Sequence, residues 1–169
     1  MDQWLIILSA VVGVFLIIGT GAAARLGGWL TEEADASLLK IVVRVLLPCF
    51  MFSEIVGNPA MREPTNILLS PVVGFIATAG GCGLALAVGR LIGRWIGLTT
   101  PVQVGTFAMC VGVFNYGFIP IPLIQNVFTE QASTTLGVLF AHNVGVELAM
   151  WTVGLIVLSG RLDRAGTAG

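Results

Sequence analysis

Five apolar runs, each long enough to cross a lipid bilayer, follow one another along this chain with little sequence between them. A helix needs about 20 mainly apolar residues to cross the hydrocarbon core. The runs cover residues 4–24, 38–56, 67–89, 102–128 and 135–158. Charged residues make up only 10 % of the chain, whereas a soluble domain carries about 25 %. We therefore expect an all-α membrane protein with five transmembrane helices, forming a single transmembrane domain over residues 1–169.

Several other classes of protein lack support in the sequence. The net charge of −1 offers no electrostatic attraction for nucleic acid. The three cysteines lie in apolar runs without a CxxC pair, so we expect no metal site and no cofactor. The HExxH and GxSxG motifs are absent, so we do not expect an enzyme. The first run has no basic stretch before it and no cleavage site, which indicates a retained span and not a signal peptide.

The basic residues of the loops predict how the chain is oriented in the membrane. With five spans, one side carries only Arg62, whereas the other side carries several arginines, namely Arg25, Arg90, Arg94, Arg161 and Arg164. Cytoplasmic loops carry the excess of Lys and Arg. We therefore expect the N-terminus outside and the C-terminus in the cytoplasm of a plasma (inner) membrane, with residues 159–169 as a flexible cytoplasmic tail.

The fourth run contains a pattern that a continuous helix does not tolerate. Asn115, Tyr116 and Gly117 are followed by Pro120 and Pro122. Proline removes a backbone donor and clashes with the preceding turn of a helix. We expect the fourth helix to be broken at these prolines, with its freed amides facing a polar guest. A half-helix that begins near Pro120 would favour an anion at its positive end. The alternative is a proline kink satisfied by neighbouring helices.

The fifth run carries an ionisable pair. Asn143 and Glu147 are four residues apart and share one helical face. Charged groups inside a membrane mark functional sites by default. A carboxyl group buried in hydrocarbon favours its neutral form, so Glu147 is the candidate for proton coupling. Interhelical polar contacts are the alternative for this pair. His142 projects away from this face and is a weaker candidate, and Ser53 in the second run could also face the cavity.

Three stretches of the sequence resemble the auxin efflux carrier family, which includes plant PIN-type auxin exporters and bacterial malonate or malate permeases. The first stretch combines residues 21–25 (Gly-Ala-Ala-Ala-Arg), 31–39 and the Leu-Pro pair at 47–48. The other two are residues 114–123 and 136–151, which match in residue type and in order. Together the three stretches span most of the chain.

The resemblance implies a fold similar to the bile-acid and sodium/proton carriers, in which two inverted five-helix halves each contribute a broken helix. This chain corresponds to the N-terminal half, ending after five spans where the family continues. The resemblance implies that Asn115, Tyr116, Pro120 and Pro122 form the crossover. It also implies that Asn143, Glu147 and Ser53 line the substrate pocket.

Two functions remain open on this basis. The first is half of a secondary transporter for small organic anions, such as auxin-like monocarboxylates or malonate and malate, working by alternating access. Its partners would be the substrate, the lipid bilayer, and a second five-helix half or further copies of this chain. The second function is a non-transporting membrane assembly or regulatory subunit. An intramembrane enzyme that uses His142 and Glu147 lacks a supporting motif.

Overall fold

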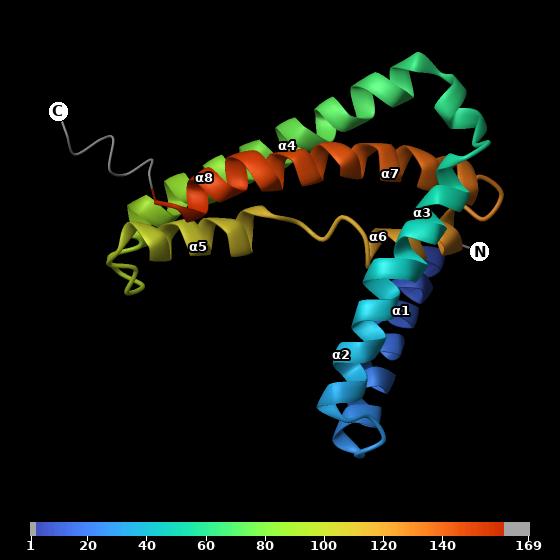
Figure 1. Ribbon diagram of the computed structural model, residues 1–169, viewed down its shortest axis with the longest axis horizontal. Helices are drawn as coiled ribbons and strands as arrows, with labels where there is room; N and C mark the ends of the chain where they lie inside the picture. Colours follow the sequence, from blue (N-terminus) through green and yellow to red (C-terminus); the bar gives the residue numbers. More distant parts are fainter. Residues whose placement is uncertain (1–2, 161–169) are drawn as a thin grey trace. The chain divides into compact units, whose positions relative to one another are not determined.

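Long apolar helices dominate the computed structural model, which describes residues 3–160 (Figure 1). The first helix, α1, covers Gln3–Leu26. A second helical stretch joins α2 (Glu32–Ile41), the π-helical turn η1 (Val42–Leu46) and α3 (Leu47–Ile55). Arg161, Arg164 and most of the predicted tail at 159–169 lie outside the described residues.

The remaining helices follow a short 3-10 turn, η2 (Pro59–Arg62). They are α4 (Pro64–Ile92), α5 (Pro101–Gly112), α6 (Pro120–Val127), α7 (Ala132–Ala149), the π-helical turn η3 (Met150–Gly154) and α8 (Leu155–Leu158). The described residues contain no β-strand. The expected all-α class is therefore confirmed.

Four helical stretches are long and apolar enough to cross a membrane. They are Trp4–Leu26, Glu32–Ile55, Pro64–Ile92 and Ala132–Leu158. They correspond to the first, second, third and fifth predicted runs. The fourth predicted run is divided between α5 and α6, and α5 is too short to span a bilayer. The number of membrane crossings therefore depends on whether α5 and α6 together cross the bilayer.

The chain divides into two compact units, which we describe separately. One unit contains the residues up to Glu63 together with Gly117–Phe140. The other contains Pro64–Tyr116 together with the residues from Ala141 onward. Helix α7 begins in the first unit and ends in the second.

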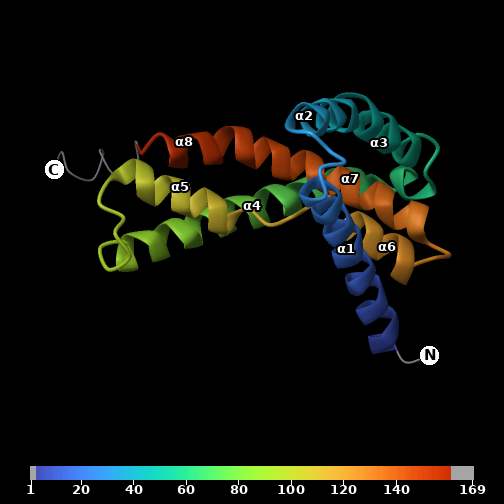
Figure 2. The same cartoon turned by 90° about the horizontal axis from the view of Figure 1, so that it is seen from below.

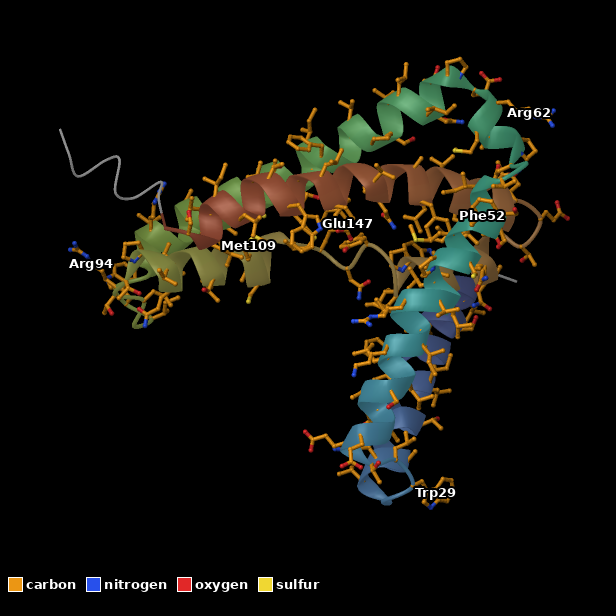
Figure 3. The ribbon with its side chains drawn as sticks, in the orientation of Figure 1. Trp29, Phe52, Arg62, Arg94, Met109 and Glu147 are labelled. Atoms are coloured by element: carbon orange, nitrogen blue, oxygen red, sulfur yellow. The ribbon has the colours of Figure 1, made fainter. Side chains whose placement is uncertain are left out.

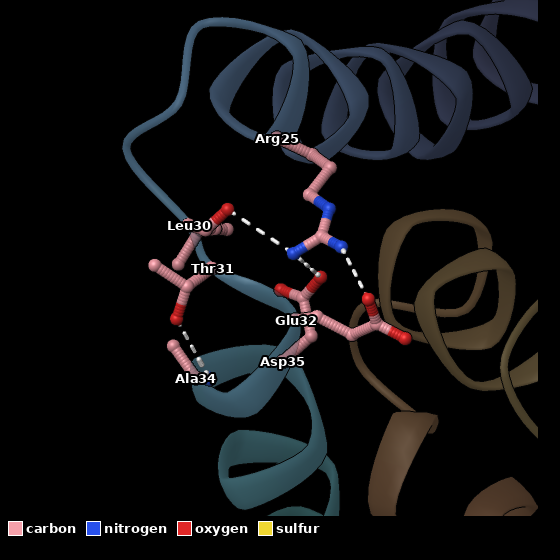
Figure 4. A network of polar contacts seen from close by, with 6 residues as sticks. All are labelled: Arg25, Leu30, Thr31, Glu32, Ala34 and Asp35. Carbon is pink, nitrogen blue, oxygen red and sulfur yellow. Dashed lines mark hydrogen bonds and ion pairs between the residues drawn. The ribbon is translucent and has the colours of Figure 1, made fainter.

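In the first unit, an ion-pair network closes the turn between α1 and α2 (Figure 4). The guanidinium of Arg25 lies 3.0 Å from a carboxylate oxygen of Asp35 and 3.8 Å from one of Glu32. The same guanidinium donates a hydrogen bond of 3.2 Å to the carbonyl oxygen of Leu30. Thr31 caps α2 by accepting a hydrogen bond from the amide of Ala34. These contacts begin the second helical stretch, since a capped N-terminus with acidic residues in its first turn is stabilised.

A buried asparagine fixes the other end of the second helical stretch. Asn58 is only 5 % exposed. Its side-chain amide donates hydrogen bonds of 2.7 Å to the carbonyl oxygens of Glu54 and Ser133, and its Oδ1 accepts one from the amide of Ala60. Gly137 of α7 packs directly on this side chain, where a Cβ would overlap it. Asn58 thereby joins the end of α3 to the beginning of α7.

In the second unit, α4 lies alongside α5 and contacts η3, while α8 contacts α5 (Figure 1 and Figure 2). Its buried core consists of small and branched apolar residues, namely Ala85, Leu86, Val104, Ala108 and Val157. Outside this core most large apolar side chains are exposed, as expected for helices whose solvent is lipid.

Glycines allow the backbones in this unit to approach closely. A Cβ on Gly145 of α7 would overlap the carbonyl oxygen of Pro71 in α4, and a Cβ on Gly74 would overlap that of His142. Gly105 of α5 is packed in the same way against the carbonyl oxygen of Val157. Small residues at helix contacts are the usual solution in membranes, where helix association depends on close packing.

Candidate functional site

The helix of the fourth run ends at Gly112, before the prolines are reached. Residues 113–119 are not helical. The last helical hydrogen bond joins the amide of Val113 to the carbonyl oxygen of Met109, at 3.3 Å. Gly112 packs so tightly against Cys82 that a Cβ there would lie 2.7 Å from the Cα of Cys82. The predicted break is therefore present, but it precedes the prolines.

Pro120 and Pro122 begin α6 and do not interrupt a helix. Proline suits the first turn of a helix, because the amide hydrogens there have no helical partner. The two remaining amides of this turn are already bonded: Ile121 donates to Gly117 at 3.0 Å and Leu123 donates to Ile119 at 3.3 Å. The expectation that free amides at this half-helix face a polar guest is therefore wrong for α6. Its first turn has lost two donors to proline and has used the other two.

The carboxylate of Glu147 accepts a hydrogen bond at each of its two oxygens. The hydroxyl of Tyr116 donates to Oε1 at 2.6 Å, and Nε1 of Trp151 donates to Oε2 at 3.0 Å. Figure 3 shows the Glu147 side chain pointing from α7 toward the non-helical segment. Indole nitrogen can only donate, so Oε2 of Glu147 is the acceptor in its contact with Trp151. Each carboxyl oxygen of Glu147 thus has one neutral hydrogen-bond partner.

Asn143 ties the same helix to the backbone of the break. Its side-chain amide donates a hydrogen bond of 3.0 Å to the carbonyl oxygen of Tyr116. Asn143 is only 4 % exposed, and its bond to Tyr116 is partly buried. Its Oδ1 lies 3.4 Å from Nδ1 of His142. The ring of Phe114 contacts the rings of His142 and Tyr116, with centroid distances of 6.1 Å and 6.5 Å.

A buried hydroxyl group lies close to this cluster along α4. Thr78 is fully buried, and among the described residues its Oγ1 has no hydrogen-bond partner. It lies one turn after Gly74, which meets His142, and one turn before Cys82, which meets Gly112. Buried polar groups are almost always satisfied by protein, water or an ion. Thr78 thus offers a polar group beside the start of the break.

The cluster contains one acidic side chain, Glu147, that is partly accessible. Glu147 is exposed at the surface of its unit. No Lys, Arg or His side chain within residues 3–160 makes an ion pair with it. Its hydrogen-bond partners among these residues, Tyr116 and Trp151, are both neutral. Once protonated, the same group could donate a hydrogen bond.

The predicted site residues fall into two groups. Tyr116, Asn143 and Glu147 meet in the second unit, and Asn115 lies on the same non-helical segment. Ser53, Pro120 and Pro122 belong to the first unit and are described within it. The hydroxyl of Ser53 donates to the carbonyl oxygen of Phe50, in its own helix, at 2.8 Å. The site assignment of all seven residues remains a prediction.

Sequence reasoning did not include Trp151 and Phe114 in the site. Trp151 lies four residues after Glu147, so the helical spacing that paired Asn143 with Glu147 also predicts this contact. Phe114 gave no comparable signal, because its contact with His142 depends on how the non-helical backbone folds back on α7.

The model of a protein family described as "Membrane transport protein" matches residues 6–166 of the chain. The chain belongs to this family. The match confirms the resemblance to the auxin efflux carriers. The chain is thus a multi-pass membrane protein of a transporter family, in keeping with its apolar helices.

Two curated relatives from the yeast Saccharomyces cerevisiae share this membrane transport family. Protein ECM3 is 31 % identical over 156 residues, which cover 89 % of this chain and 24 % of the yeast protein. Uncharacterized transporter YNL095C is 29 % identical over 156 residues, which cover 89 % of this chain and 23 % of that protein. The chain therefore spans about a quarter of the length of the curated relatives it matches. No solved structure matches it.

Proposed function

We propose that this membrane transport family member is the N-terminal half of a secondary carrier for small organic anions, coupled to protons through Glu147. Auxin-like monocarboxylates and malonate or malate are the substrate classes. The observation that supports this proposal is the pair of contacts that Tyr116 makes with α7, through its hydroxyl to Glu147 and through its carbonyl to Asn143.

The proposed coupling between proton binding and anion binding follows from the charge on Glu147. With Glu147 ionised, its negative charge repels an anionic substrate and keeps the Tyr116 and Trp151 donors occupied. Protonation removes the charge, weakens both hydrogen bonds and gives the carboxyl group a hydrogen to donate. An organic anion could then accept hydrogen bonds from Tyr116, Trp151 and Glu147 itself. Proton and anion would thus bind together.

Alternating access would use the break between α5 and α6. Non-helical backbone at membrane depth is tolerated where it is covered by protein or lines a cavity. Carriers built from inverted repeats place their substrates at such broken helices near the middle of the membrane. In this proposal, movement of the two halves of a complete carrier exposes the site first to one side and then to the other.

The test measures binding of radiolabelled malonate and indole-3-acetate to the purified chain across a pH series. We expect binding to rise as the pH falls in the wild type. Glu147→Gln mimics the neutral carboxyl group, so it should bind at every pH with little pH dependence. Asn143→Ala should lose binding. Glu33→Gln, which removes an exposed acid of α2, is the matched control and should behave as the wild type.

Flux into proteoliposomes that contain this chain together with a second five-helix half, under an imposed pH gradient, completes the test. Uptake that depends on the gradient, and that Glu147→Gln uncouples from it, would support the carrier. If the wild type neither binds nor moves either anion, while crosslinking captures it with another membrane protein, the non-transporting subunit is the better account. A pH dependence that survives Glu147→Gln would remove the coupling role from this residue.

A further inference from the structure

A hollow lies in the same unit as the Glu147 cluster, between the end of α4 and the beginning of α5. Its volume is about 210 Å³. It is lined by two arginines, two threonines and an apolar wall, including Arg90, Arg94, Thr99, Thr100, Leu98 and Val104. None of these residues takes part in the Glu147 cluster. The hollow is therefore a separate feature, and its interpretation does not depend on the proposed transport function.

The rim of the hollow is held by hydrogen bonds of a tight turn. The amide of Leu98 donates to the carbonyl oxygen of Gly93 at 2.7 Å, and Gly97 supplies the left-handed conformation that the turn needs, with φ of 84°. Oε1 of Gln103 accepts from the amides of Thr99 and Thr100, at 2.8 and 3.0 Å. The side chain of Thr100 in turn accepts from the amide of Gln103. The hollow is therefore preformed.

The positive charge of the hollow comes from guanidinium groups. The capping contacts already occupy the Thr99 and Thr100 amides and the amide of Gln103. Arg90 lies in the last turn of α4, Arg94 lies in the turn that follows Ile92, and both line the hollow. Arg94 is exposed, and Figure 3 shows it extending away from the ribbon. A planar guanidinium matches phosphate oxygens in a bidentate arrangement.

The residues around the hollow are typical of the membrane–water interface. Helix α4 is long and apolar enough to span a membrane, and the hollow lies at its C-terminal end. Large apolar side chains beside the arginines are strongly exposed: Leu91 by 80 %, Trp95 by 87 % and Ile96 by 51 %. Tryptophan and arginine next to such residues are typical of the membrane–water interface. At a membrane surface, lipid headgroups are the main source of phosphate.

We propose that this hollow binds the headgroup of an anionic phospholipid. The phosphate would lie against Arg94 and Arg90, the threonine side of the hollow would face the polar glycerol end, and Leu98 and Val104 would contact the beginning of the acyl chains. Basic pockets at the membrane surface gain affinity from each arginine near an anionic headgroup. The lipid would fix the turn between α4 and α5 at the membrane surface.

Native mass spectrometry of the full chain, released from micelles titrated with a single lipid, tests the proposal. The probes are phosphatidylglycerol, phosphatidylcholine and inorganic phosphate. We expect phosphatidylglycerol to be retained in preference to phosphatidylcholine. Arg94→Gln should weaken its retention about fivefold, the effect expected for one arginine near an anionic lipid. Arg94→Lys keeps the charge and should restore most of the binding.

Arg62→Gln is the matched control, because Arg62 is an exposed arginine in a different loop (Figure 3). It should leave lipid retention unchanged. Circular dichroism and a single elution peak establish that each variant is folded, which is expected for substitutions at exposed positions. Equal retention of both lipids, or an equal loss in Arg62→Gln, would overturn the proposal. Displacement of phosphatidylglycerol by inorganic phosphate at equal concentration would show a free-phosphate site instead.

Discussion

Tyr116, on the non-helical segment after α5, donates a hydrogen bond of 2.6 Å to Glu147 near the C-terminal end of α7. The same tyrosine accepts one from Asn143 through its backbone carbonyl oxygen. One residue of the break is thus held to α7 at two points, by its side chain and by its backbone. These two bonds join the non-helical segment to α7.

Tyr116→Phe should destabilise the protein by removing the bond to Glu147. A hydrogen bond to a charged group contributes about 1.5–3 kcal/mol, and we expect the lower end because Glu147 is exposed within its unit. Thermal unfolding in mild detergent measures the effect. Ser53→Ala is the control: the Ser53 hydroxyl only bonds its own helix, so its loss should change stability by much less. Equal losses in the two variants would contradict this role of Tyr116.

Gly145→Ala should disrupt the contact between α7 and α4. The added methyl group would overlap the carbonyl oxygen of Pro71, and overpacking of this kind costs about 1–3 kcal/mol or more. The measurement is the yield of monodisperse protein together with its thermal midpoint. Gly80→Ala in α4 is the matched control, since a Cβ there meets no atom within 4 Å. It should be neutral or slightly stabilising, because alanine favours helix over glycine.

Asn58→Ala should loosen the junction between α3 and α7. The substitution leaves three backbone groups without the partner that the buried side chain provides, and we expect a loss of about 2–3 kcal/mol. Limited proteolysis of residues 56–66 reports the loosening. Asn126→Ala serves for comparison, because the exposed Asn126 only bonds the carbonyl oxygen of Pro122 in its own helix. Comparable protease sensitivity in both variants would refute the role of Asn58.

The orientation expected from the loop charges can be tested with single cysteines. In a background without Cys49, Cys82 and Cys110, we introduce Arg62→Cys or Trp29→Cys, both at exposed positions labelled in Figure 3. A thiol reagent that does not cross membranes should label the first variant in intact cells. It should label the second only after permeabilisation. The reverse pattern would invert the predicted topology.

The sequence predicted the helices of this fold well, because the cost of unpaired backbone groups in lipid leaves few alternatives to helix. Four of the five apolar runs became helical stretches of membrane-spanning length, and the fourth was divided as expected. The helical periodicity also predicted that Asn143 and Glu147 act on one side of α7, where both reach Tyr116.

The error concerned the prolines. Pro120 and Pro122 indicated irregular backbone correctly, but proline is also a good first-turn residue, and the sequence does not state on which side of a proline the helix fails. The answer depends on Gly112, whose packing against Cys82 ends α5 before the prolines are reached. Such a contact joins residues 30 positions apart and leaves no local pattern. The polar groups of the break therefore come from Tyr116 and α7, and not from the amides of α6.

The glycine contacts of α4 prevent it from sliding along its neighbours. At Gly74, Gly81 and Gly145 one backbone touches another with no side chain between them, so there is no flexible layer to absorb sliding. A shift of α4 along α7 by even a fraction of a helical turn would drive carbonyl oxygens into Cα atoms. In the proposed transport cycle we therefore expect α4 and α7 to move together, with any bending confined to the segments that connect the helices.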